Sequence, residues 1–84
     1  MLTATDRKAK FKAVEQRRKR RIENLRQCAE LYDSWRQFAL ALGLDPSFLH
    51  ALAGPNPRRN IGDDLARSIE LTLKLEPGWL DEQH

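Results

Sequence analysis

The sequence contains few residues of several kinds, and each shortage excludes a class of protein. Its 84 residues include one cysteine, Cys28, so no internal disulfide can form and no cysteine-based zinc site has enough ligands. No apolar run approaches the roughly 18 residues of a membrane-spanning helix, and the N-terminus has no apolar signal-peptide region. We therefore expect a protein without a membrane segment that works in the cytoplasm.

Groups for catalysis and cofactor binding are equally scarce. The sequence shows no glycine-rich phosphate loop, no His pair at metal-ligand spacing and no nucleophile arranged with a base. A chain of this length has room for one hydrophobic core, which excludes a two-domain enzyme. We therefore expect a binding protein that is not an enzyme and needs no cofactor, metal or small-molecule substrate.

Charge is abundant and unevenly distributed. Residues 1–24 contain nine Lys or Arg against three Asp or Glu, a net charge of +6, whereas residues 63–84 carry a net charge of −4. The basic segment has the composition of a polyanion-binding surface, although a solvated helix face or a loose tail has the same composition. Its densest run of cations consists of Arg17, Arg18, Lys19, Arg20 and Arg21.

Helical periodicity separates this basic segment from a folded domain. A complete apolar stripe predicts a core helix over about 19–32, and its members are Ile22, Leu25, Ala29 and Tyr32. Residues 7–18 lack such a stripe and would be helical only when their charge is neutralised. We therefore expect a basic N-terminal arm at 1–18 and one domain at 19–84.

The next two helices are predicted by their capping residues. Ser34 offers a cap to a short helix that ends at Gly43, and Asp45 caps another that begins at Pro46. The three residues 43–45 between them have the spacing of a helix-turn-helix motif. A fourth helix follows, with the expected core stripe Leu65, Ile69, Thr72 and Leu73.

An ordered series of short segments carries a family resemblance over about residues 20–82. The segments are ALALGLDPSFL (39–49), NPRRNIGD (56–63), LARSIE (65–70) and GWLD (78–81). They resemble phage-repressor-like helix-turn-helix proteins of the lambda repressor and Cro type. The resemblance implies a compact all-α DNA-binding fold of four or five helices that acts in transcriptional repression. Many members continue into a self-cleaving, dimerising domain, which we expect this chain, ending at His84, to lack.

The resemblance also implies which residues meet DNA. It places the third helix in the major groove, although a structural role for His50 is an equal alternative to a base contact. Trp35 is expected in the core, whereas Arg36 or Gln37 reaches a phosphate. The expected base readers on the third helix are Pro46, Ser47, His50 and Ala51.

A phosphate clamp is expected ahead of the fourth helix. The Asn60 amide, Arg59 and nearby backbone N–H groups would hold one phosphate, with Arg58 beside them. The alternative role of Asn60 is a helix cap. The cationic run 17–21 would add further phosphate contacts.

Two functions of different classes follow from these features. The first is a sequence-specific DNA-binding regulator, associated with the nucleoid when bound to double-stranded DNA. The second is a protein-interaction adaptor or antitoxin that uses another face of the same fold. Trp79 is expected to close the core, but an exposed apolar end would instead pair two copies into a homodimer.

Overall fold

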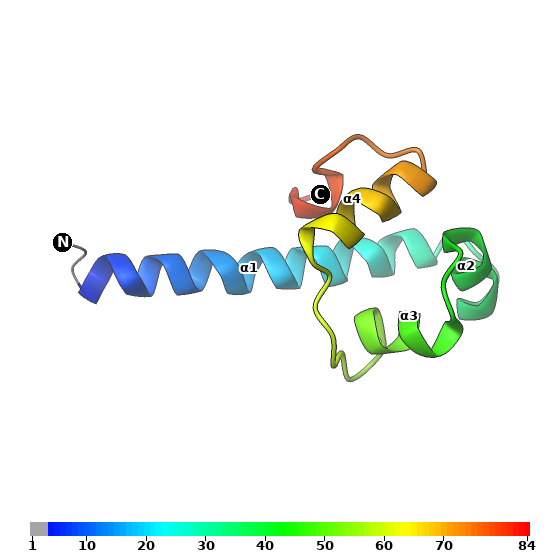
Figure 1. Ribbon diagram of the computed structural model, residues 1–84, viewed down its shortest axis with the longest axis horizontal. Helices are drawn as coiled ribbons and strands as arrows, with labels where there is room; N and C mark the ends of the chain where they lie inside the picture. Colours follow the sequence, from blue (N-terminus) through cyan, green and yellow to red (C-terminus); the bar gives the residue numbers. More distant parts are fainter. Residues whose placement is uncertain (1–3) are drawn as a thin grey trace.

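The computed structural model describes residues 4–84, and it describes their side chains from residue 16 onward (Figure 1). The helices are α1 (Ala4–Ala29), α2 (Trp35–Leu42), α3 (Pro46–Ala53) and α4 (Asp63–Thr72), followed by a 3₁₀ turn, η1 (Trp79–Asp81). No strand occurs among the described residues. The predicted all-α fold of four or five helices is therefore confirmed.

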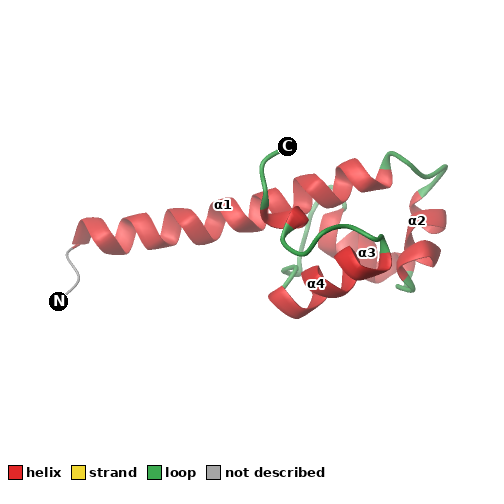
Figure 2. Ribbon diagram, turned by 90° about the horizontal axis from the view of Figure 1, so that it is seen from above, coloured by secondary structure: helices red, strands yellow, loops and turns green. Residues whose placement is uncertain are grey.

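Helix α1 contains the basic segment and the first core helix in one continuous element. Its first half projects beyond the other helices, and its second half packs against them (Figures 1 and 2). The predicted bounds of about 19–32 were wrong at both ends. The helix begins earlier, at Ala4, because no Pro or Gly interrupts the backbone before residue 19, and it ends earlier, at Ala29. Residues 1–3 of the predicted arm lie outside the described residues, and the division into arm and domain stays a prediction.

The core lies where the second half of α1 meets the three later helices. Its buried apolar residues are Leu25, Cys28, Phe38, Ala39, Leu42, Leu49, Leu52, Ala53, Ile61, Ala66, Ile69 and Leu80. The expected inward position of Thr72 was wrong, because its exposed hydroxyl donates to the carbonyl of Ser68 at 2.9 Å. Ala66 occupies the inner face of α4 instead, and the side chain of Ala66 is fully buried.

A buried arginine ties three separate parts of the chain together. The side chain of Arg21 is 7% exposed, and its Nη1 donates to the carbonyl of Ile61 at 2.7 Å. Its Nη2 lies 2.7 Å from Oδ1 of Asp63, and its Nε donates to Asp81. Arg21 therefore fixes α1 to the loop before α4, to the start of α4 and to η1.

The C-terminal segment is held by two further buried polar side chains. Glu70 is 1% exposed, and its carboxylate accepts the backbone N–H groups of Gly78 at 3.0 Å and Leu80 at 2.8 Å. Nδ2 of Asn24 donates to the carbonyl of Leu80 at 2.9 Å. Leu80 is fully buried and Trp79 is half-buried, so this segment closes the core as expected.

The Arg21 ion pairs also change the acidity of their carboxyl partners. The hydrogen bond from Arg21 lowers the pKa of Asp81 from 3.8 to about 2, against the opposing effect of burial. The same arginine lowers the pKa of Asp63. A folded-state pKa below the ordinary value means that Asp81 binds its proton less tightly in the folded protein than in the unfolded chain. Its contribution to stability is therefore complete above about pH 4 and is lost as the pH falls towards 2.

We expect Asp81→Asn to lower the free energy of unfolding by about 2 kcal/mol at pH 7, since it removes a carboxylate from a largely buried arginine. The difference between the two proteins should shrink between pH 4 and pH 2, which urea unfolding at several pH values measures. Asp64→Asn is the matched control, because Asp64 lies in the first turn of α4 next to Asp63, which pairs with Arg21. A difference that stays constant across this pH range would contradict the role given to Asp81.

Candidate nucleic-acid interface

Local capping sets the geometry of α2, the turn and α3. The hydroxyl of Ser34 accepts the backbone N–H of Gln37 at 3.2 Å, which starts α2. Gly43 ends it in the left-handed conformation, with φ of 70°, and the N–H of Leu44 then reaches back to the carbonyl of Ala39 at 2.9 Å. The carboxylate of Asp45 accepts the N–H of Ser47 at 3.3 Å and starts α3. The predicted capping and turn residues are confirmed.

Packing between α2 and α3 decides which face of α3 stays outside. Ala39 on α2 is fully buried, so the two helices approach closely at a small side chain. Leu49 and Leu52 point inward from α3 and are also fully buried. The opposite face of α3 presents Pro46, Ser47 and His50, which are exposed, and Ala51, which is half-buried. A buried structural role for His50 is therefore excluded.

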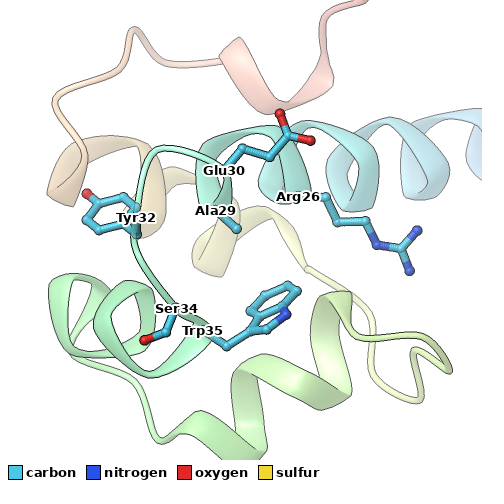
Figure 3. A pocket seen from close by; sticks show the side chains of 6 residues that line it. All are labelled: Arg26, Ala29, Glu30, Tyr32, Ser34 and Trp35. Carbon is cyan, nitrogen blue, oxygen red and sulfur yellow. The ribbon is translucent and has the colours of Figure 1, made fainter.

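Trp35 lies at the surface and not in the core. Its side chain is 37% exposed and lines a shallow hollow between the end of α1 and the start of α2, with Arg26, Glu30 and Tyr32 (Figure 3). The expected core position was wrong because Trp35 is the first residue of α2, where one side of the indole has no neighbouring turn to cover it. Its ring centroid lies 6.4 Å from that of His50, so it borders the outer face of α3.

The loop after α3 is fastened to that helix by its backbone. The N–H groups of Arg58 and Arg59 both donate to the carbonyl of Ala51, at 2.8 and 3.1 Å. Arg58 lines a hollow together with His50, and the guanidinium carbon of Arg59 lies 5.7 Å from the ring centroid of Phe48. Both arginine side chains are exposed. The structure therefore brings these two cations beside the outer face of α3.

Asn60 joins this loop to α1 instead of capping α4. Its Oδ1 accepts a hydrogen bond from Arg18, and the N-cap position of α4 is Gly62, which makes no side-chain cap bond. The alternative prediction that Asn60 caps the fourth helix was wrong, because α4 begins at Asp63 and Asn60 lies too early in the chain. Arg18 on α1 is therefore joined directly to the loop that carries Arg58 and Arg59.

The other predicted cations are distributed over two helices. Arg17 and Lys19 are exposed and Arg20 is half-buried on α1, and Lys19 shares a hollow with Pro57. Arg36 and Gln37 are exposed in the first turn of α2. Arg21 is separated from this group, because its guanidinium is used inside the fold and cannot meet a phosphate.

Sequence reasoning missed Arg26, which lies in the last turn of α1. Its Nε donates to the carbonyl of Ala53 at 2.9 Å and its Nη2 to that of Gly54 at 2.6 Å. A cation in the last turn of a helix usually interacts with the carbonyls of its own helix, so residue type and position alone do not indicate that Arg26 binds the end of α3.

The described residues show few features of other classes of site. From residue 16 onward, no three His, Cys, Asp or Glu side chains gather closely enough to hold a metal ion. No helix in the described part of the chain has the length and apolarity to cross a membrane. Cys28 is buried in the core as a small apolar residue, and this burial raises the pKa of its thiol.

Comparison with known proteins finds a local sequence similarity to a prophage repressor. Forty-seven residues, 56% of the chain, are 38% identical to the prophage repressor CohE of Escherichia coli (strain K12). The match covers 21% of that repressor, so the chain spans about a fifth of the length of the curated relative it matches. The predicted resemblance to phage-repressor-like helix-turn-helix proteins is confirmed by this similarity. No family model and no solved structure matches the chain.

Replacing Gly43 by Ala should lower the free energy of unfolding by about 1 kcal/mol, because an L side chain is strained at φ of 70°. Chemical denaturation followed by circular dichroism measures the difference. Gly62→Ala is the matched control: Gly62 has φ of −69° and open space around it, so we expect a change within about 0.5 kcal/mol. Equal effects at the two glycines would contradict the role of Gly43 in the turn.

Proposed function

We propose that this protein is a sequence-specific DNA-binding transcriptional regulator of the repressor type. The observation that carries the proposal is the outer face of α3, which is free of core contacts and bordered by exposed cations. The local similarity to a prophage repressor supports the same class of function. Double-stranded DNA is the proposed partner, and a second copy of the chain would allow two half-sites to be contacted together.

Base recognition is assigned to the exposed positions of α3. The hydroxyl of Ser47 and the imidazole of His50 can form hydrogen bonds with base edges, and Ala51 can contact a thymine methyl group. Pro46 at the start of the helix supports the approach to the groove. No Arg, Gln or Asn on this face can make a bidentate base contact, so discrimination must come from several modest contacts added together.

Phosphate contacts are assigned to the cations around α3. Arg58 and Arg59 are anchored through their backbones to Ala51, so their positions are coupled to the helix that would lie in the groove. Asn60 presents its amide nitrogen to a phosphate while Arg18 holds its oxygen. The exposed pair at the start of α2, Arg36 and Gln37, would contact the backbone on the other side of the groove.

The basic half of α1 adds a contact that depends on salt. An α-helix rises about 1.5 Å per residue, so the cations of this segment would be distributed along a duplex. Each phosphate that a Lys or Arg neutralises releases counterions, so this segment should raise affinity for DNA of any sequence. We therefore assign the arm to affinity and α3 to specificity.

A protein-interaction role is the second candidate, and exposed leucines favour it. Leu31 is 85% exposed and Leu71 is 81% exposed, so each offers an apolar side chain that a partner protein could cover. Binding measured on specific and random duplexes over a range of salt concentrations separates the two functions. DNA binding with a steep salt dependence and a preferred sequence supports the regulator, and its absence supports the adaptor.

We expect Ser47→Ala and His50→Ala to change the ranking of operator variants while altering the free energy of unfolding by less than about 0.5 kcal/mol, because both side chains are exposed. Competition binding against a randomised duplex library measures the ranking. The double variant Arg58→Ala, Arg59→Ala is the contrasting control, since loss of phosphate contacts should weaken binding to all duplexes alike. An unchanged ranking in both reader variants would refute base reading by α3.

Removal of residues 1–18 should leave the remaining domain folded, because among the side chains described from residue 16 onward the first apolar ones of the core lie beyond residue 21. DNA affinity should fall, and if about three lost cations neutralise phosphates, the slope of log K against log salt should shrink by about 2.7. Titrations at four or more salt concentrations measure this slope. A truncated protein with an unaltered slope would show that the arm does not contact DNA.

A further inference from the structure

Arg26 crosses from α1 to the end of α3 and binds two consecutive carbonyl groups. The acceptors are the oxygens of Ala53, the last residue of α3, and Gly54, its C-cap. Figure 3 shows the Arg26 side chain leaving α1 on the side of the hollow that Trp35 borders. The planar guanidinium offers two donors in a fixed fork, so it sets the orientation of both carbonyls and not merely their charge environment.

Gly54 transmits this constraint to His50. Its N–H donates to the carbonyl of His50 at 2.8 Å, and Gly54 itself is buried. A Cβ placed on Gly54 would lie 2.5 Å from the His50 carbonyl oxygen and 2.6 Å from its Nδ1, so the glycine backbone lies against both the main chain and the ring. Pro55 follows and keeps Gly54 in the extended conformation that is observed, with ψ of −172°.

The His50 ring therefore has fixed neighbours on two sides. Gly54 lies beside Nδ1, and the indole of Trp35 has its centroid 6.4 Å from the imidazole centroid. The ring is nevertheless exposed, as a base-contacting group must be. An exposed side chain ordinarily samples several rotamers, and the two neighbours reduce that freedom before any ligand arrives.

We propose that Arg26 is a positioning residue for specificity: through Gly54 it holds the His50 ring in the orientation used to contact a base. The inference rests on the proposed function of α3, and it assigns to α1 a part in sequence discrimination that needs no contact with DNA. In this assignment Arg26 acts on His50 from within the protein, whereas Arg58 and Arg59 contact phosphates.

The positioning is tested first in the free protein. Arg26→Lys keeps the charge near the end of α3 and loses the fork, so nuclear Overhauser contacts from the His50 ring to the Gly54 Hα protons should weaken at least about twofold. Arg20→Lys is the matched control. It is the same substitution on the same helix, but at a position beside Gln83 and not beside α3. Unaltered contacts in folded Arg26→Lys would overturn the proposal, whatever the protein binds.

The consequence for specificity is tested by a double-mutant cycle on DNA. Arg26→Lys alone should reduce the ratio of specific to random binding by about fivefold while leaving the salt slope unchanged, since no phosphate contact is lost. In a His50→Ala background the same change should alter this ratio by less than about 1.5-fold. Equal effects in both backgrounds would show that Arg26 acts by a general structural route and would overturn the assignment.

The two measurements separate this proposal from the function on which it rests. If His50→Ala leaves the ranking of duplexes unchanged, the reading role of His50 is refuted and the specificity assignment of Arg26 is overturned with it. If His50→Ala alters the ranking but Arg26→Lys does not alter the ratio, the proposed function stands and Arg26 is only a helix cap.

Discussion

Arg21 makes the buried ionic contact on which the arrangement of α4 and the C-terminal turn against α1 depends. Its guanidinium reaches a loop carbonyl, the start of α4 and the 3₁₀ turn, so one side chain connects three segments to α1. A buried charge without partners would be costly, so the native arrangement is favoured over those that leave Arg21 unpaired. This contact therefore serves mainly to select one arrangement of these segments, more than to add to the free energy of burial.

The hydrogen bonds that hold the fold together leave the outer face of α3 available for binding. Arg21, Asn24 and Glu70 hold the C-terminal segment against one side of α1 and α4, and Arg26 holds α3 against another. The outer face of α3 takes part in none of these contacts. Its neighbours are the loop cations Arg58 and Arg59, and Arg18 on α1 donates a hydrogen bond to Asn60 of the same loop.

Features set by adjacent residues could be predicted from the sequence, and features set by distant residues could not. Ser34, Gly43 and Asp45 act within five residues of themselves, so their capping roles follow from residue type and spacing. Arg21 looks like one more exposed cation in a basic run, because its partners Asp63 and Asp81 are 42 and 60 residues away. Ser47, His50 and Ala51 were placed by resemblance, and the structure adds only their exposure.

Because α1 is continuous, the angular position of each N-terminal charge around the helix axis depends on the number of residues between it and the core. Because the helix runs without interruption from Ala4 into the core, each backbone position from 4 to 15 has a fixed phase relative to Arg18 and Arg21. One residue inserted into this stretch would rotate everything before it by about 100° around the axis, whereas seven would restore the phase almost completely. Related chains should therefore tolerate arms that differ by whole pairs of turns better than arms that differ by one residue.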